Sequence, residues 1–156
     1  MPGADYFGSA KQKFAFARNL PIVAVVNMKT SDNQGHQILV VDDEPSVCKA
    51  IKLLLEFDGH SVKTVESGEA ALAMFEPGMF DLVITDYSMW GMKGDALAAF
   101  IKARHPDQAI IMATAFAGDF PTAGKSSAGV DFVISKPFSL TELRDAITKV
   151  IPESPA

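Results

Sequence analysis

The chain has 156 residues, 48% of them hydrophobic and 21% charged, so it can bury one globular core and leaves no room for a second ordinary domain. A total of 14 Lys and Arg against 19 Asp and Glu gives a net charge of -5, the wrong sign for a protein that mainly neutralises nucleic-acid phosphates. A single cysteine excludes an internal disulfide framework, and no apolar run approaches the roughly 20 residues that span a bilayer. We therefore expect a cytoplasmic protein without direct contact to nucleic acid or membrane.

The first 36 residues differ in composition from the rest. Residues 1–27 carry three basic side chains and one acidic one, a net charge of +2 that leaves -7 for the remainder. Residues 20–26 are apolar but too few for a secretion signal, and Met28 begins a stretch typical of an ordinary bacterial protein start. We expect residues 1–36 to be a disordered N-terminal extension, residues 37–151 to be the folded domain and residues 152–156 to be a short tail.

From residue 37 onward, short apolar runs alternate with segments of helical period, a pattern typical of an α/β fold with a parallel sheet. Four of the five apolar runs are nearly continuous, as expected when helices cover both faces of the sheet. The segment 61–65 instead alternates between apolar and polar residues, which indicates an edge strand. Strands are predicted at residues 38–42, 61–65, 81–85, 109–113 and 132–135.

The first three helices have readable ends. Pro45 suits a first helical turn, and Gly59 ends that segment. Ser67 can cap the second helix. The third helix begins near Asp95 and stops before Pro106. The side chains predicted to face the core from these helices are Val47, Ile51, Leu54, Leu55, Leu72, Phe75, Leu97, Phe100 and Ile101.

The last two helices differ in how well the sequence supports them. Between Phe116 and Gly129 there are two further glycines, a proline and a serine pair, all poor in a helix interior, so we expect a short or mobile fourth helix. The segment from Ser139 to Glu142 is a capping box and predicts the start of the last helix. Its predicted core-facing side chains are Leu140, Leu143, Ile147 and Val150.

Polar side chains stand at the predicted carboxyl ends of four strands, where parallel sheets bind their ligands. The first strand ends in Asp42 and Asp43, and the third ends in Asp86. The fourth ends in Thr114, and the fifth is followed by Lys136. Three carboxylates at one edge repel one another unless a cation neutralises them. Such oxygen ligands, with waters and a phosphoryl oxygen, match the preferences of Mg²⁺.

These residues, in this order and spacing, resemble the receiver domain of bacterial two-component response regulators over roughly residues 37–151. The separations are 43 residues from Asp43 to Asp86, 28 from there to Thr114 and 22 more to Lys136. Each motif alone is weak, but four in order are specific. The motifs are Ile38-Leu39-Val40-Val41-Asp42-Asp43-Glu44, Asp86-Tyr87-Ser88-Met89-Trp90-Gly91-Met92-Lys93-Gly94, Ala113-Thr114-Ala115 and Ser135-Lys136-Pro137-Phe138.

The resemblance implies a flavodoxin-like (βα)5 domain, a doubly wound α/β fold whose five-stranded parallel sheet has the order 2-1-3-4-5. It implies that Asp86 is the nucleophile that accepts a phosphoryl group. Thr114 would hydrogen-bond one phosphoryl oxygen, and Lys136 would pair with another. The bond from Lys136 to Pro137 would be cis.

The resemblance also implies a metal, a donor and a mode of action. The Mg²⁺ ligands would be the carboxylates of Asp42, Asp43 and Asp86 together with the backbone carbonyl of Ser88. A sensor histidine kinase or a histidine phosphotransfer protein would supply the phosphoryl group, so the domain would be a phosphoacceptor that assists its own phosphorylation and dephosphorylation and not an enzyme. Because only five residues follow the last predicted helix, we expect a single-domain regulator that acts in trans on an unknown downstream protein.

Several positions depart from the family pattern. Trp90 stands where a proline is usual, and Lys93 replaces a commonly acidic residue. Val133 replaces the aromatic residue that often moves inward on phosphorylation, and its neighbour Phe132 should point to the opposite face of the strand. Phe116 is predicted to shield the acyl phosphate from water.

Other interpretations of the same residues remain open at this stage. Asp43 or Glu44 could simply cap the helix that begins at Pro45. An aspartyl-phosphate phosphohydrolase would need a second carboxylate where Ser88 stands, and a flavin binder would need a first loop rich in glycine and hydroxyls. The chain could also be a receiver-like binding module that is never phosphorylated, or a receiver fragment of a hybrid histidine kinase. Cys48 is expected to be a small buried apolar residue, and the histidines are assigned no role.

Overall fold

Five parallel strands form the central sheet of the computed structural model, which describes residues 35–115 and 129–152. Every neighbouring pair of strands is parallel, and the order across the sheet is β2-β1-β3-β4-β5. The predicted doubly wound α/β fold with strand order 2-1-3-4-5 is therefore confirmed, and the segment predicted as an edge strand lies at the edge. The strands are β1 (Gln37–Val41), β2 (Ser61–Val65), β3 (Leu82–Asp86), β4 (Ala109–Thr114) and β5 (Phe132–Ser135).

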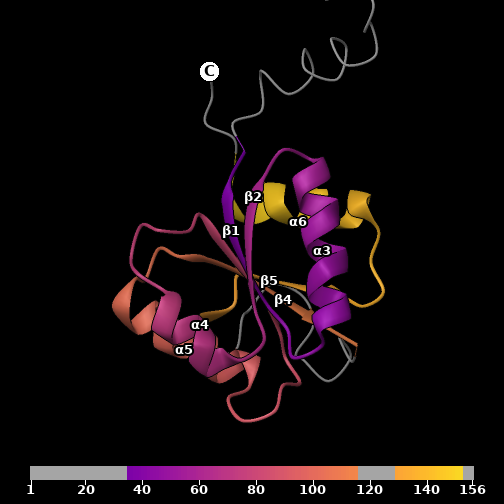
Figure 1. The fold of residues 1–156 in the computed structure, drawn as a ribbon. Helices are drawn as coiled ribbons and strands as arrows, with labels where there is room; N and C mark the ends of the chain where they lie inside the picture. Colours follow the sequence, from indigo (N-terminus) through magenta and orange to yellow (C-terminus); the bar gives the residue numbers. More distant parts are fainter. Residues whose placement is uncertain (1–34, 116–128, 153–156) are drawn as a thin grey trace, which may run out of the picture. The chain divides into compact units, whose positions relative to one another are not determined.

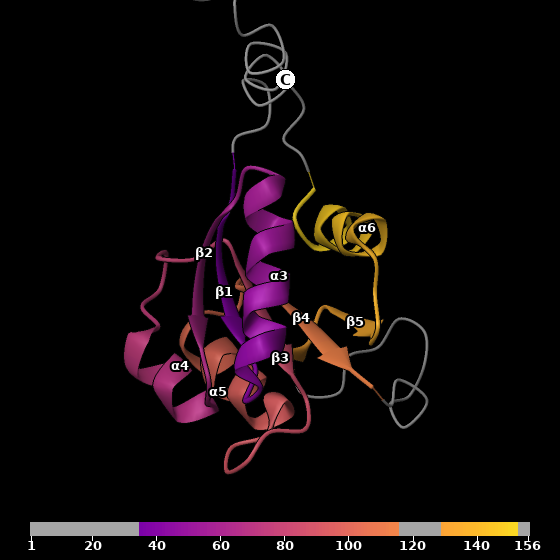
Figure 2. The same cartoon turned by 45° about the vertical axis from the view of Figure 1, so that its right-hand side comes forward.

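Helices cover both faces of this sheet. The described helices are α3 (Pro45–Phe57), α4 (Gly68–Met74), α5 (Gly94–Arg104) and α6 (Leu140–Val150). In Figures 1 and 2, α3 and α6 lie on one face, and α4 and α5 lie on the other. Alternate residues of each strand serve the two faces, because successive side chains point to opposite sides of a sheet.

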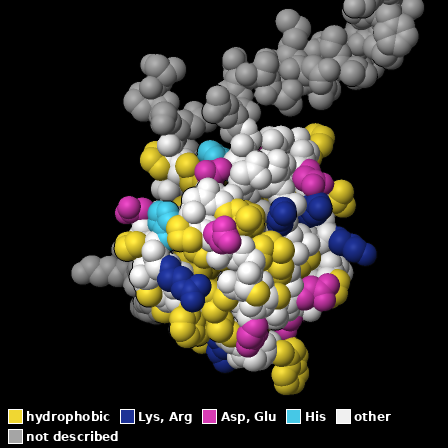
Figure 3. Space-filling view, turned by 60° about the vertical axis from the view of Figure 1, so that its left-hand side comes forward, with side chains coloured by type: hydrophobic (Ala, Val, Ile, Leu, Met, Phe, Trp, Pro, Cys, Tyr) yellow, Lys and Arg dark blue, Asp and Glu magenta, His cyan; other side chains and the backbone are white. Residues whose placement is uncertain are grey.

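The core is accordingly divided into two apolar clusters. In β1, the fully buried Ile38 and Val40 pack toward α3 and α6, and Leu39 and Val41 pack toward α4 and α5. Burial on both faces explains why the central strands are continuous apolar runs in the sequence. The face shown in Figure 3 leaves some hydrophobic side chains visible among charged ones of both signs.

The helix ends follow the predicted chemistry. The Ser67 hydroxyl accepts a hydrogen bond from the backbone N–H of Ala70 at 3.0 Å and so caps α4. At α6, the Ser139 side chain accepts from the Glu142 N–H, and the Glu142 carboxylate accepts from the Ser139 N–H at 2.7 Å. Pro45 opens α3. The predicted capping box is confirmed.

Some sequence predictions need correction. Strands β1 and β3 are offset by one residue from the predicted 38–42 and 81–85, so Asp86 is itself the last residue of β3. Phe100 was predicted to face the core but is 53% exposed. Helix α5 turns Leu97, Ala98 and Ile101 toward the sheet instead, because the small Ala98 allows close approach and rotates Phe100 to the surface. Leu72 and Val150 are partly buried but pack against the core as predicted, whereas Leu54 and Leu140 are only partly buried.

The two faces of β5 are occupied as predicted. Phe132 packs in the cluster beside α3 and α6, with the ammonium of Lys149 4.7 Å from its ring centre. Val133 packs in the other cluster. Cys48 is buried, as expected, and its thiol donates to the Asp42 carbonyl at 3.3 Å.

Three predictions fall largely on residues outside the described ranges: the disordered extension over residues 1–36, the fourth helix together with Phe116, and the tail over residues 152–156. Among the residues that the structure describes, no helix is both long and apolar enough to cross a membrane.

Candidate functional site

The parallel sheet gathers the predicted site residues at one edge, the carboxyl ends of its strands. Asp42 directly follows β1, and Asp86 ends the neighbouring strand β3. Thr114 ends β4, and Lys136 directly follows β5. The strand register places Asp42 beside Asp86 and pairs Asp86 with Ala113 and Thr114 with Ser135, so Thr114 and Lys136 lie one and two residues beyond this line at the same edge of the sheet. Their convergence therefore follows from strand pairing and not from an unusual loop.

Three carboxylates form the centre of this edge. One oxygen atom from each of Asp42, Asp43 and Asp86 lies within 4.8 Å of the other two. Asp42 and Asp86 are buried, with exposed fractions of 2% and 9%. Backbone amides hold the outer oxygens, because the N–H of Glu44 donates to Asp42 Oδ1 at 2.9 Å and the N–H of Trp90 donates to Asp43 Oδ2 at 3.2 Å.

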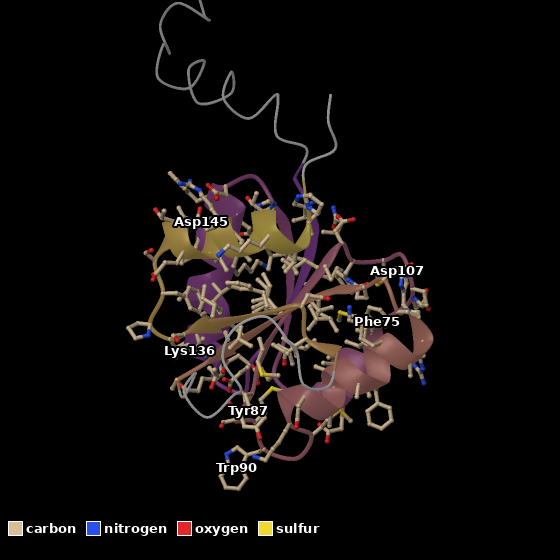
Figure 4. The ribbon with its side chains drawn as sticks, turned by 180° about the vertical axis from the view of Figure 1, so that it is seen from behind. Phe75, Tyr87, Trp90, Asp107, Lys136 and Asp145 are labelled. Atoms are coloured by element: carbon tan, nitrogen blue, oxygen red, sulfur yellow. The ribbon has the colours of Figure 1, made fainter. Side chains whose placement is uncertain are left out.

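Lys136 supplies the positive charge of the cluster. Its Nζ lies 2.6 Å from Asp42 Oδ2 and 3.2 Å from Asp86 Oδ1, so one ammonium contacts two carboxylates from different strands. The Lys136-Pro137 peptide bond is cis, as predicted. Figure 4 shows Lys136 at the same end of the molecule as Tyr87 and Trp90, with Asp145 at the opposite end.

The charges and the burial shift the ionisation of these groups. Burial raises the pKa of Asp86 above its ordinary value, and the nearby Asp42 and Asp43 charges add to this, while Lys136 opposes it. Burial alone would lower the pKa of Lys136, but its hydrogen bonds and charge interactions with Asp42 and Asp86 outweigh that effect and raise it. The ammonium therefore remains charged at neutral pH, and the site stays short of positive charge.

Thr114 and Ser88 complete the predicted set. Thr114 is 1% exposed at the end of β4, and its carbonyl accepts from the Lys136 N–H at 2.8 Å, which ties the two strand ends together. Ser88 is exposed in the loop between β3 and α5, two residues after Asp86. The structure thus brings Asp42, Asp43, Asp86 and Lys136 into one cluster, with Thr114 at the same edge and Ser88 in the adjoining loop.

The simpler interpretation of the acidic pair, a helix cap, is contradicted. Glu44 is the N-cap residue of α3, but its side chain makes no capping hydrogen bond. The Asp43 carboxylate reaches across to the Trp90 amide, 47 residues away, instead of to α3. The Asp43 side chain therefore turns toward the loop after β3 and away from the start of α3.

The donor atoms fit a small divalent cation. Three carboxylates face one ammonium, so the cluster keeps an excess of negative charge that is costly in a half-buried place without a further cation. The candidate ligand atoms are all oxygens, which Mg²⁺ prefers, whereas soft metal ions prefer the sulfur of cysteine thiolates.

Sequence reasoning missed three contacts around this cluster. The Trp90 amide binds Asp43, the Cys48 thiol binds the Asp42 carbonyl, and the Glu69 carboxylate accepts from the Met92 amide at 3.1 Å. Two of these use backbone donors, which every residue type except proline carries, so no side-chain motif could reveal them.

Comparison with known proteins decides the family. The sequence matches the family model of the response regulator receiver domain over residues 38–148. The chain belongs to this family. The receiver domain is the part of a response regulator that accepts a phosphoryl group, so the family supports a phosphoacceptor role for the chain.

Curated relatives agree with this assignment. The receiver domain is 36% identical over 118 residues to the transcriptional regulatory protein GlrR of Escherichia coli, covering 75% of this chain and 26% of the relative. It is 32% identical over 114 residues to the response regulator protein FleR of Pseudomonas aeruginosa, covering 72% of this chain and 24% of that protein. The chain thus spans about a quarter of the length of these two regulators.

A solved structure of a response regulator matches this fold over nearly the whole length of the solved chain. The response regulator TrrA of Thermotoga maritima, crystallised in complex with Mg²⁺-BeF, is 36% identical to this receiver domain with a TM-score of 0.67. The match covers 74% of this chain and 98% of that one.

Proposed function

We propose that this receiver domain accepts a phosphoryl group on Asp86 from a phosphohistidine of a sensor histidine kinase or a histidine phosphotransfer protein. The observation that carries the proposal is the meeting of three carboxylates and one ammonium at the carboxyl ends of β1, β3 and β5. A site that is rich in carboxylates and short of cations is suited to a divalent cation together with a phosphoryl group.

The chain's own residues suit the transfer. An Asp86 carboxylate oxygen would form the bond to phosphorus while the bond from phosphorus to the histidine nitrogen breaks, and the nitrogen keeps that electron pair. Lys136 already lies 3.2 Å from Asp86 and would pair with a phosphoryl oxygen as charge builds up. Thr114, at the end of the next strand, would donate its hydroxyl to another phosphoryl oxygen. Catalysis of this kind depends on position and electrostatics.

The carboxylates of Asp42, Asp43 and Asp86 and the backbone carbonyl of Ser88 would hold Mg²⁺. The ion would supply positive charge that screens the phosphoryl oxygens from the carboxylates. Binding would also relieve the repulsion among the carboxylates in the cluster.

We further propose that residues 37–151 form the functional receiver unit in the cytoplasm and that it signals in trans by binding an unidentified downstream protein. The described core supports this boundary, because the sheet starts at Gln37 and the last helix ends at Val150. A signal that passes through partner binding requires that phosphorylation changes the surface near the site, where Trp90 is 88% exposed.

The first test is the mass of the intact protein after incubation with Mg²⁺ and acetyl phosphate, and separately with phosphoramidate as a donor with a phosphorus–nitrogen bond. We expect one added phosphoryl group on the parent and none on Asp86→Asn. The matched control is Asp107→Asn, because Asp107 is exposed between α5 and β4, far from the cluster (Figure 4). Absence of a mass gain with both donors would contradict the proposal and favour a receiver-like binding module.

A further inference from the structure

The loop between β3 and α5 carries Ser88, and several hydrogen bonds hold it. The Trp90 N–H donates to Asp43 Oδ2 at 3.2 Å, and the Met92 N–H donates to Glu69 Oε1 at 3.1 Å. The Gly94 N–H donates to the Tyr87 carbonyl at 3.0 Å and closes the base of the loop. The Tyr87 carbonyl is local to the loop, and Asp43 belongs to the acidic cluster. Glu69 is the exception, because it belongs to a different helix and lies outside the cluster.

Glu69 packs directly against the loop backbone. It is the second residue of α4, which Ser67 caps, so its backbone position is fixed. A Cβ placed on Gly91 would lie only 2.9 Å from Glu69 Oε1, and Gly91 has a φ of +75°, a conformation that glycine adopts without strain. A loop residue with a side chain at this position could not approach the carboxylate as closely. Glycine at position 91 therefore serves the contact with Glu69.

The start of α4 makes a second contact with the same segment. A Cβ on Gly68 would lie 2.9 to 3.0 Å from atoms of the Met92 side chain, so the Met92 side chain lies directly on the backbone at position 68. Met92 is thus held by its amide through Glu69 and by its side chain against Gly68. Fixing Met92 also restricts Trp90, two residues earlier, whose amide orients the Asp43 carboxylate.

We propose that Glu69 is a positioning residue that holds the loop between β3 and α5 so that Asp43 and the Ser88 carbonyl are presented together to Mg²⁺. This inference rests on the proposed function of the acidic cluster. Glu69 touches neither the ion nor the phosphoryl group, and it acts through the amides of Met92 and Trp90. In this role the Glu69 carboxylate acts as a hydrogen-bond acceptor and not as a charge. A neutral side chain of the same shape with an acceptor oxygen should therefore perform the same function.

Three variants of the full chain separate the possible causes. Glu69→Ala removes the acceptor, Glu69→Gln keeps an oxygen at the same place but removes the charge, and Glu76→Ala removes an exposed glutamate beyond the end of α4. Calorimetric titration with Mg²⁺ alone measures the affinity. We expect about tenfold weaker binding for Glu69→Ala, the lower end of what loss of a group supporting metal ligands costs. Glu69→Gln should stay within about twofold of the parent, because its amide oxygen still accepts from Met92.

Amide hydrogen exchange without Mg²⁺ supplies the second readout. In Glu69→Ala, exchange at Met92 and Trp90 should accelerate, while the amides of β1 and β3 keep their protection, which excludes general unfolding. In Glu69→Gln and Glu76→Ala, exchange at these two amides should match the parent.

Each contrary result has its own meaning. Unchanged Mg²⁺ affinity in Glu69→Ala, with a parent that binds Mg²⁺ and becomes phosphorylated, overturns the positioning role and leaves the proposed function intact. Equal weakening in Glu69→Gln and Glu69→Ala also overturns it, because long-range charge would then be the cause. A parent that binds no Mg²⁺ and gains no phosphoryl group contradicts both proposals.

Discussion

The two ends of the β-sheet handle polar groups in opposite ways. At the carboxyl edge, the carboxylates of Asp42, Asp43 and Asp86 cluster, and the Lys136 ammonium pairs with those of Asp42 and Asp86. At the amino edge, the Asp81 carboxylate accepts a backbone hydrogen bond, and the Asp58 carboxylate pairs with the Arg144 guanidinium. The carboxyl edge therefore keeps an unsatisfied excess of one charge in a buried place, whereas the amino edge contributes to folding stability. The contrast indicates that function and stability are assigned to opposite ends of the same strands.

The pairs at the amino edge can be named. The His36 N–H donates to His60 Nδ1 at 3.0 Å, and the two rings stack with centres 5.4 Å apart. The Asp81 carboxylate accepts from the Gln37 N–H at 2.7 Å, where β1 begins. Close by, the Arg144 guanidinium binds the Asp58 carboxylate and so joins α6 to the end of α3. These contacts link the starts of β1, β2 and β3 and join α6 to the end of α3.

The largest effect is expected from a substitution in the acidic cluster at the carboxyl edge. Asp86→Asn should abolish phosphorylation and at the same time raise the free energy of unfolding in metal-free buffer by about 1 kcal/mol, because it removes a buried charge that repels its neighbours. The pKa of Asp86 is raised in the folded state, so its ionised form costs stability above that pKa and the cost disappears at low pH. Urea unfolding at pH 7 and pH 3 measures both effects. A variant less stable than the parent at pH 7 would contradict the contrast between the two edges.

The next largest effect is expected from removing the Lys136 ammonium, which pairs with Asp42 and Asp86. Lys136→Met should slow phosphorylation by acetyl phosphate about 100-fold, the scale on which a preorganised charge contact affects transfer reactions. It should also destabilise the fold by roughly 1 to 3 kcal/mol, because Asp42 and Asp86 lose their partner while Lys136 is partly exposed. Rates by intact mass and unfolding by urea test this. Lys49→Met, at an exposed position of α3, is the control.

A substitution at the amino edge should lower the stability of the fold and leave the phosphorylation rate nearly unchanged. Arg144→Ala removes the bridge between α6 and the end of α3, so the melting temperature should fall by a few degrees. The phosphorylation rate should stay within about twofold of the parent, because additivity is expected for sites far apart. Arg104→Ala removes an exposed arginine at the end of α5 and should alter neither quantity. A marked loss of phosphorylation in Arg144→Ala would show that the two edges are coupled.

The smallest expected effect is a pH dependence at the amino edge. Burial lowers the pKa of His60, repulsion from His36 adds to this, and Asp58 opposes it. A proton therefore prefers the unfolded chain, so the stability from neutral His60 is present above its ordinary pKa of 6.5 and is lost as the pH falls below that value. Protonation at Nδ1 would also remove the acceptor for the His36 N–H.

The corresponding variant is His60→Asn, compared with His105→Asn in the segment after α5. When the pH is lowered from 7.5 to 5.5, the urea midpoint of unfolding should fall less for His60→Asn than for the parent. The fall for His105→Asn should equal that of the parent. An equal fall in all three proteins would assign the acid sensitivity to other groups.

The sheet and the residues of the site could be predicted from the sequence, because parallel strands follow a simple geometric rule. Parallel strands end at one edge, so polar residues after consecutive apolar runs must meet there, and Asp42, Asp86 and Lys136 do. The capping box at Ser139 was equally readable, because it depends on side chains at fixed local spacing.

Features that depend on helix rotation and on backbone donors could not be predicted in this way. Phe100 is exposed because α5 approaches the sheet on the side of Ala98, a choice made by packing between helix and sheet. The link from Glu69 to Met92 joins a helix to a loop 23 residues later through a backbone N–H, which leaves no trace in side-chain patterns. The roles of Asp86, Thr114, Lys136 and the metal ligands remain predictions that the experiments above test.

The edge strand β2 has a consequence for how molecules of this protein meet one another. An exposed strand edge can pair with the edge of a second chain and start aggregation. In β2, Ser61 and Lys63 are exposed, and a lysine on an edge strand discourages such pairing because two copies would bring like charges together. At the opposite edge, β5 is only four residues long and offers few backbone groups to a second strand. The sheet is therefore built against intermolecular strand addition at both of its edges.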